Sequence, residues 1–253
     1  MLDGYIDLRS DTVTAITASQ RVAMAYAVTG DMLYEDDRYV SELEHRLALW
    51  FGVDDCVWMP SCTMANLVAL ALASSRGDEI IVGATSHINA LERKNAASLL
   101  GVSYAALPDS NGRLDISDLS STLAVESEFQ PHQSAIALEN THNLAGGRAF
   151  HPSYLQTVCA IAGANSLAVH VDGARIFNAS VALAVPLAEW FRSAELGSMS
   201  LSLSKALGTP AGGALLVRTL DDGRRARRHR KALGGTMHTG AGYLASAALA
   251  IVQ

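Results

Sequence analysis

Apolar residues recur along this chain at two spacings, and each spacing predicts a different element. In residues 39–51 they stand three or four positions apart between polar side chains, which is typical of an amphipathic helix. A short unbroken apolar run follows at 56–59, as expected for a buried strand. Residues 63–73 are rich in Ala and Leu and predict a second helix.

The same alternation continues through the middle of the chain. Apolar runs with the length of strands are separated by segments with the composition of helices. Strands are expected at 79–82, 102–107, 134–138 and 167–171, helices at 91–100 and 152–162, and a turn at 111–113. Strands that alternate with helices build a mostly parallel sheet with helices on both faces. The predicted fold class is therefore α/β.

The last part of the chain follows a different pattern. Ser alternates with Met or Leu over residues 198–204, and an apolar run at 212–217 follows a turn that contains Gly, Thr and Pro. This arrangement predicts an antiparallel hairpin. The Ala-rich segment from Tyr243 onward predicts a helix without a C-cap, so we expect the chain to be cut short.

Two chemically active side chains come after predicted strands. Asp172 follows the strand at 167–171, and Lys205 follows the strand at 198–204. In open α/β sheets, ligands bind at the carboxyl ends of the strands. A lysine amine can condense with the aldehyde of pyridoxal phosphate, and a carboxylate can keep the pyridine nitrogen of that cofactor protonated. The pair therefore predicts a pyridoxal phosphate site.

Two further segments are candidates for the same site, and each has a simpler alternative. Ser61, Cys62 and Thr63 stand where a helix begins after a strand, and the free amides of such a helix start can bind phosphate. A Ser or Thr at this position can equally serve only as an N-cap. His87 follows the strand at 79–82 and could stack on the cofactor ring, or be an ordinary surface histidine.

Composition and charge exclude several other classes of protein. The net charge of −6 disfavours general affinity for nucleic acid. The arginine-rich residues 224–231 are either a solvated helix face or a patch that faces an anion or another subunit. The three cysteines include no CxxC pair, so neither disulfides nor a metal site is expected. No apolar stretch reaches the length of about 18 residues that spans a bilayer, and the start lacks a secretory signal, so a cytoplasmic protein without membrane partners is expected.

Four segments of the chain carry a resemblance to a known family. They are residues 6–14 (IDLRSDTVT), 138–143 (LENTHN), 170–178 (HVDGARIFN) and 203–205 (LSK). In this order they resemble the low-specificity L-threonine aldolases, which are fold-type I pyridoxal phosphate enzymes. The resemblance implies a large domain over residues 1–253 with a seven-stranded sheet and an N-terminal arm of about residues 1–35. It also implies that a C-terminal small domain is absent or truncated, and that the chain self-associates as a dimer or a homotetramer.

The resemblance further implies a reaction and residue roles. The reaction is retro-aldol cleavage of a small β-hydroxy-α-amino acid, L-threonine or L-allo-threonine, to glycine and acetaldehyde. Lys205 would hold the cofactor aldehyde and Asp172 would pair with the pyridine nitrogen. The other roles are phosphate binding by Cys62 and Thr63, ring stacking by His87, contact of Arg175 with the phenolic oxygen and the substrate carboxylate, contact of Ser10 with that carboxylate, and contact of His142 with the substrate hydroxyl. Either His87 or His142 could be the base.

Three of these assignments have structural alternatives. Arg175 could be an ion-pair partner, Ser10 a turn former and His142 a capped loop residue. Departures from the family pattern also occur. Cys62 and His238 stand where glycine and arginine are usual, and Met64, Glu35 and Arg38 replace glutamine, glycine and proline. Another pyridoxal-phosphate-dependent β-eliminating lyase, or a cofactor-binding but inactive truncated subunit, therefore stays open as an alternative function.

Overall fold

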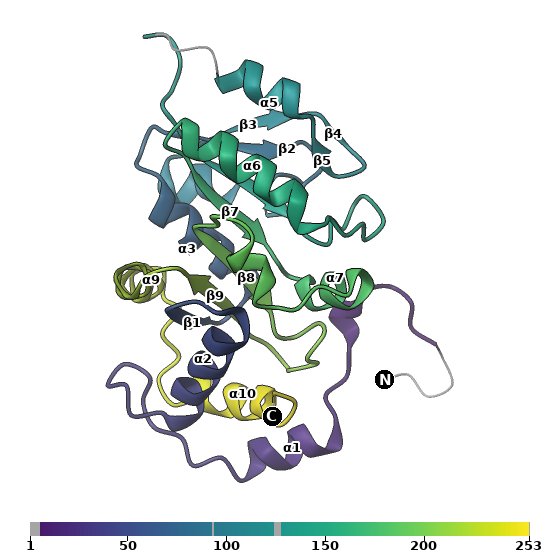
Figure 1. Ribbon diagram of the computed structural model, residues 1–253. Coiled ribbons are helices and arrows are strands. Elements are labelled where there is room, and N and C mark those ends of the chain that lie inside the picture. Colours follow the sequence, from purple (N-terminus) through teal and green to yellow (C-terminus); the bar gives the residue numbers. More distant parts are fainter. Residues whose placement is uncertain (1–5, 93, 124–127, 253) are drawn as a thin grey trace.

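The computed structural model describes residues 6–92, 94–123 and 128–252, and its centre is a seven-stranded sheet (Figure 1). The strands lie in the order β1-β9-β8-β7-β6-β2-β3. Their bounds are β1 Asp55–Met59, β2 Glu79–Gly83, β3 Ser103–Leu107, β6 Gln133–Glu139, β7 Ala168–Asp172, β8 Ser198–Ser202 and β9 Gly213–Val217. Neighbouring strands from β8 to β3 are parallel, and β9 is antiparallel to both β8 and β1. The predicted fold class is confirmed, and each strand of this sheet falls on a segment that was predicted to be a strand.

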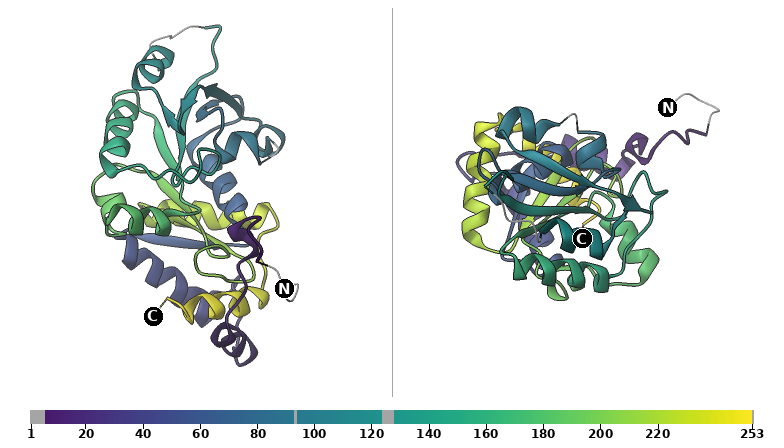
Figure 2. Two further views of the ribbon diagram at one scale, coloured as in Figure 1. Left: turned by 90° about the vertical axis from the view of Figure 1, so that its right-hand side faces the viewer. Right: turned by 90° about the horizontal axis from the view of Figure 1, so that it is seen from above.

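Helices cover both faces of this sheet (Figure 2). They are α1 Ala18–Ala25, α2 Arg38–Phe51, α3 Cys62–Ala73, α4 His87–Ala90, α5 Ile116–Leu123, α6 Pro152–Ala164, α7 Ile176–Leu183, α8 Glu189–Arg192, α9 Leu220–Ala232 and α10 Gly240–Leu249. The chain also forms the 3-10 helix η1 Asp11–Val13, the π-helical turn η2 Ala96–Leu100, and a hairpin of β4 Asp109–Ser110 and β5 Arg113–Leu114. Within the described ranges, none of the helices has the length and apolar character needed to cross a membrane.

Successive residues of the strands supply the two covered faces. In β2, Ile81 belongs to the same hydrophobic cluster as residues of α6, whereas Ile80 and Val82 belong to the cluster that includes residues of α3. All three side chains are fully buried. Strands that are buried on both faces appear in the sequence as continuous apolar runs. This is why the middle strands could be predicted from their runs alone.

The continuous helix predicted over residues 91–100 is wrong. α4 ends at Ala90, and η2 begins only at Ala96. Between them, Lys94 has a φ of 58°, a left-handed conformation that does not continue a right-handed helix. The Glu92 side chain turns inward and is only 5% exposed. The contacts of Glu92 in the folded protein therefore override the local helical pattern.

The N-terminal arm folds back onto the rest of the molecule. A capping box between Thr17 and Gln20 begins α1, and α1 packs against α10, which in turn packs against α2 (Figure 1). The Gln20 side chain is fully buried and donates a hydrogen bond to the carbonyl oxygen of Leu207 at 2.8 Å. The arm thereby contacts the loop that follows β8.

β1 is an edge strand, and side chains satisfy its outward-facing backbone groups. The Trp58 N–H donates to Glu44 Oε1 at 2.7 Å, and the Trp58 carbonyl oxygen accepts from Arg230 Nη1 at 2.7 Å. The Cys56 carbonyl oxygen accepts from Arg227 Nη2 at 3.3 Å, and its N–H donates to the preceding carboxylate at 2.8 Å. α2 and α9 thus supply hydrogen-bonding partners that a further strand would otherwise provide.

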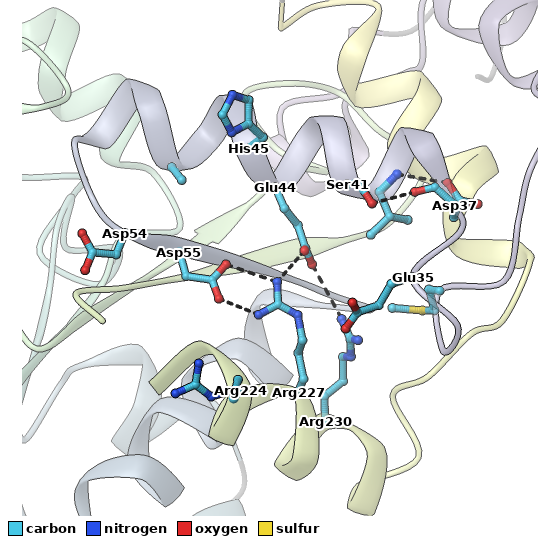
Figure 3. Close-up of a pocket in the computed structure, with 13 residues that line it drawn as sticks. Glu35, Asp37, Ser41, Glu44, His45, Asp54, Asp55, Arg224, Arg227 and Arg230 are labelled. Carbon is cyan, nitrogen blue, oxygen red and sulfur yellow. Dashed lines mark hydrogen bonds and ion pairs between the residues drawn. The ribbon is translucent and has the colours of Figure 1, made fainter. Parts of the chain in front are cut away.

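The same side chains line a polar pocket of about 380 Å³ between α2, β1 and α9 (Figure 3). Arg227 contacts Asp55 at 2.6 Å and Glu44 at 2.7 Å. Arg230 is only 5% exposed. A solvated helix face for residues 224–231 is therefore wrong for Arg227 and Arg230, because the edge of the sheet provides partners for both.

Candidate active site

The sheet brings the sequence-predicted lysine and carboxylate to the same edge. Asp172 is the last residue of β7, and β7 and β8 are parallel neighbours with Asp172 opposite Ser200. Lys205 follows the end of β8 in a turn closed by a hydrogen bond from Gly208 N–H to its carbonyl oxygen at 3.1 Å. Asp172 is 2% exposed, whereas Lys205 is half-buried. The carboxyl ends of two adjacent strands therefore carry this pair.

Neutral donors surround the Asp172 carboxylate. Its Oδ2 accepts from Asn66 Nδ2 at 2.9 Å, and its Oδ1 accepts from Ala174 N–H at 3.0 Å and from the Ser200 hydroxyl at 3.4 Å. The site therefore holds a buried group that can accept a further hydrogen bond from a cationic ligand.

The first turn of α3 lies beside Asp172. Ser61 is the N-cap and accepts from Met64 N–H at 3.1 Å. Cys62 and Thr63 are the first two residues of the helix, where backbone N–H groups have no partner within the helix and can bind an anion. The Cys62 Sγ lies 3.4 Å from Ser200 Oγ and 3.9 Å from Asp172 Oδ1. Burial, together with the charge of Asp172, raises the pKa of Cys62 well above its usual value.

His87 is tied to three acidic residues and is not an ordinary surface histidine. Its backbone N–H donates to Glu139 Oε2 at 2.8 Å. Its ring Nδ1 lies 3.2 Å from Glu92 Oε1 and 3.8 Å from Asp172 Oδ2. The hydrogen bond with Glu92 raises the pKa of His87, and the charges of Asp172 and Glu139 add to this, while partial burial acts in the opposite direction.

His142 lies deeper than His87, and its side chain is only 1% exposed. Its Nδ1 accepts from Ala145 N–H at 3.2 Å. Its Nε2 lies 3.4 Å from Asp109 Oδ2 and 3.6 Å from Glu139 Oε2. The β4–β5 hairpin covers the ring, since a Cβ on Gly112 would lie 2.5 Å from His142 Cγ. Both ring nitrogens therefore face protein atoms.

Arg175 forms a bidentate ion pair with the N-terminal arm. Its Nε lies 2.6 Å from Asp11 Oδ2, and its Nη2 lies 2.8 Å from Asp11 Oδ1. This hydrogen bonding lowers the pKa of Asp11, and the positive charges of Arg175 and Lys205 contribute to the same shift. Ser10 caps η1 by accepting from Thr12 N–H at 3.2 Å. The arm is thus held beside the loop of Lys205 by the arginine that the sequence assigned to the site.

Four further residues of this region were not predicted. Asn66 donates to Glu92 Oε1 at 2.9 Å as well as to Asp172. Glu139 accepts from the N–H groups of His87 and Asn143, and burial together with the charge of Asp172 raises the pKa of Glu139. His170 contacts Asn66. Glu139 and His170 stand in segments that carry the family resemblance, but Glu92 was hidden within the wrongly predicted helix.

The residues at this edge suit an aldehyde cofactor that carries a phosphate and a pyridine ring. Lys205 offers an amine, the buried Asp172 offers a carboxylate, and the start of α3 offers free amides. His87, Glu92 and Asp172 also place one possible metal-ligand atom each within 4.8 Å of one another. Asn66 already links the two carboxylates of that group by hydrogen bonds. The fold and this site define the protein as an α/β protein of fold type I.

Similarity to known proteins specifies the class further. Residues 7–253 match the family model described as beta-eliminating lyase. An uncharacterised protein of Caenorhabditis elegans is 40% identical over 246 residues, which cover 96% of this chain and 58% of that protein. The low specificity L-threonine aldolase of Escherichia coli K12 is 38% identical over 246 residues, which cover 96% of this chain and 72% of that protein. The chain belongs to the beta-eliminating lyase family.

A solved structure shares the fold. Leishmania major threonine aldolase superposes with a TM-score of 0.84 at 22% identity, over 96% of this chain and 70% of that chain. The chain spans only 58% to 72% of the two curated relatives named above. The activity and partners of the whole protein are therefore matters for proposal.

Proposed function

We propose that this chain forms the cofactor-binding unit of a pyridoxal-phosphate-dependent aldehyde-lyase that cleaves L-threonine or L-allo-threonine to glycine and acetaldehyde. The observation that carries the proposal is the position of Asp172 and Lys205 at the carboxyl ends of the neighbouring strands β7 and β8. Membership of the beta-eliminating lyase family and the likeness to threonine aldolases support it.

Each site residue then has a task that its surroundings support. Pyridoxal phosphate, when bound, supplies a ring that withdraws electrons from the substrate Cα. Lys205 would hold the cofactor aldehyde and Asp172 would keep the ring nitrogen protonated. The α3 amides of Cys62 and Thr63 would bind the phosphate, which the helix dipole favours.

The substrate would be held by the arm and by α7. Arg175 carries a guanidinium that can bind a carboxylate in bidentate fashion, as it binds Asp11 here. A substrate carboxylate would therefore compete with Asp11 for Arg175. Ser10, which stands next to Asp11, would add a hydroxyl to the same group.

Breaking the Cα–Cβ bond requires a base that takes the proton from the β-hydroxyl. His87 and His142 are both proposed for this task, directly or through water. The His87 side chain is 27% exposed, whereas that of His142 is 1% exposed, with both nitrogens facing protein atoms. His87 is therefore the better placed of the two in this conformation. Substitution of the residue that acts as base should lower kcat by about 10²- to 10⁴-fold.

Two measurements test the proposed function. Borohydride reduction of the protein loaded with pyridoxal phosphate, followed by peptide mapping, should label Lys205. The Lys205→Ala variant should lose the label and lower threonine cleavage by more than about 10³-fold, whereas Lys94→Ala at an exposed position should keep both. A wild-type protein that stays unlabelled at residue 205 would contradict the proposal.

The family description itself favours a second candidate, elimination from an amino acid that bears a leaving group on Cβ. The same lysine and carboxylate would serve that reaction, because both reactions depend on electron withdrawal from Cα. Product analysis separates the two activities. Acetaldehyde with glycine identifies aldol cleavage, and ammonia with a keto acid identifies elimination.

A further inference from the structure

A buried row of polar side chains leads from the middle of the sheet to Asp172. Ser198 Oγ lies 2.9 Å from His170 Nδ1, and His170 Nε2 lies 3.0 Å from Asn66 Oδ1. Asn66 Nδ2 then lies 2.9 Å from Asp172 Oδ2. Ser198 is 8% exposed, and the other three residues are 2% exposed or less. Burying four polar side chains is costly unless each is hydrogen-bonded, as each of these is.

With the Asp172 and Glu92 carboxylates as acceptors, the hydrogen bonds of this row run in one direction. Asn66 Nδ2 faces the carboxylate oxygens of both Asp172 and Glu92 at 2.9 Å. Ionised carboxylates only accept hydrogen bonds, so both Asn66 N–H groups are directed at them. The Asn66 carbonyl oxygen then faces His170, which must donate from Nε2. His170 Nδ1 is left to accept from the Ser198 hydroxyl.

The protonation state of His170 agrees with this direction. Burial lowers the pKa of His170 to about 4, although the charge of Asp172 and a hydrogen bond with the Ser198 backbone act in the opposite direction. A neutral imidazole carries one proton, and its second nitrogen is an acceptor. His170 is therefore held as the Nε2–H tautomer, and the Asn66 amide is fixed against rotation.

We propose that Asn66 is a positioning residue whose amide, oriented by His170 and Ser198, holds the Asp172 carboxylate in place to accept a hydrogen bond from a protonated cofactor ring nitrogen. This inference rests on the proposed function. Other titratable groups close to Asp172 are Cys62, His87, Glu92, Glu139, His170 and Arg175. Of the side chains in this row, Asn66 is the one that donates directly to the Asp172 carboxylate at normal hydrogen-bond distance.

The first test needs no cofactor. In the cofactor-free full chain, nitrogen-15 NMR should show His170 as the Nε2–H tautomer throughout pH 6 to 8. In Asn66→Leu the Nδ1–H tautomer should become detectable, because the carbonyl oxygen that selects the Nε2–H tautomer is gone. A wild-type His170 that carries its proton on Nδ1, or that is doubly protonated at neutral pH, overturns the inference.

The second test follows cofactor affinity. Asn66→Leu and His170→Leu should each weaken pyridoxal phosphate binding about tenfold. His170→Gln should stay within about twofold of wild type, since a Gln amide can replace the Nε2 donor. Val68→Ala, a buried change on the other side of α3, controls for loss of stability and should keep the wild-type affinity.

The outcomes separate this inference from the proposed function. If Asn66→Leu keeps the wild-type affinity for pyridoxal phosphate, or if His170→Gln loses as much affinity as His170→Leu, the inference is wrong while cofactor binding by the wild type still stands. If Asn66→Leu fails to fold, the two His170 variants and the tautomer decide the question. Failure of Lys205 labelling in the wild type would instead contradict the proposed function and leave the tautomer result intact.

Discussion

At the scale of single residues, the site is built around buried carboxylates and the groups that donate hydrogen bonds to them. Asp172, Glu139 and Glu92 are each at most 5% exposed, and each accepts hydrogen bonds from neighbouring groups. His87 lies within 4 Å of two of these carboxylates. The protonation of histidines beside them is therefore the most direct reporter of the site.

His87 should titrate at a higher pH than an ordinary histidine. Its hydrogen bond with Glu92 raises the pKa of His87, so the stabilisation from this pair is complete below about pH 6.5 and disappears as the pH rises through the folded-state pKa. NMR titration of the cofactor-free protein should give a midpoint above 6.5, and Glu92→Gln should lower it. Glu189→Gln, at a glutamate paired with Arg192, should leave it unchanged. A wild-type midpoint at or below 6.5 would refute this prediction.

His170 should make the protein sensitive to acid. Burial lowers the pKa of His170 to about 4, whereas the unfolded chain takes up the same proton near pH 6.5. The folded state therefore loses stability as the pH falls below about 6.5, by about 2 kcal/mol between pH 7 and pH 5. Urea unfolding at the two pH values measures this loss. His170→Gln should show a drop smaller by about that amount, and equal drops in both proteins would disprove the assignment.

The sequence identified some of these residues and missed others for physical reasons. Asp172 and Lys205 could be predicted because Asp172 ends one buried strand and Lys205 stands shortly after another, and strand ends meet at one edge of a parallel sheet. Asn66 and Glu92 could not be predicted, because their roles arise from a contact between two separate segments of the chain. The hydrophobic pattern of each segment gives no information about the other. The roles of Ser10, Arg175 and His142 toward a substrate stay predictions.

At the scale of elements, the start of α3 depends on a close approach of β9. A Cβ on Gly213 would lie 2.6 Å from Cys62 N and 2.8 Å from the Leu201 carbonyl oxygen. Because these neighbours are backbone atoms, the rotation of a side chain could not make room for a Cβ. Glycine at this position therefore allows the helix start, where phosphate is proposed to bind, to pack against the sheet.

Gly213→Ala should displace the first turn of α3. We expect pyridoxal phosphate affinity to fall by at least about tenfold, together with a lower Tm. Gly163→Ala is the matched control, because a Cβ there meets no atom within 4 Å, and alanine within a helix is more stable than glycine by about 0.5–1 kcal/mol. Wild-type cofactor affinity in Gly213→Ala would show that this approach does not matter for the site.

Element types were easier to predict than their ends and interruptions. The strands and the helix α2 follow directly from hydrophobic runs and period. The break between α4 and η2 does not, because Glu92 leaves a helical pattern to reach Asn66. The ion pairs of Arg227 in α9 could likewise not be predicted, since its partners Glu44 and Asp55 lie far away in the sequence.

At the scale of the whole molecule, the cluster of Arg227, Glu44 and Asp55 joins α9, α2 and β1. Removing one partner leaves the other charges partly buried and uncompensated. Arg227→Ala should therefore lower the free energy of unfolding by about 3 kcal/mol. Arg224→Ala removes an exposed pair with Asp221 on the same helix and should change it by less than about 0.5 kcal/mol. Denaturant unfolding measures both, and equal effects would contradict the structural role of Arg227.

The covered edge of β1 also has a consequence for the behaviour of the chain in concentrated solution. An open strand edge is a template on which other copies can add β-structure and grow into fibrils. Here such growth would first require Glu44, Arg227 and Arg230 to release the backbone of Cys56 and Trp58. At this edge of the sheet, resistance to such growth thus resides in charged side chains of two helices, and acid strong enough to neutralise the glutamate should weaken it.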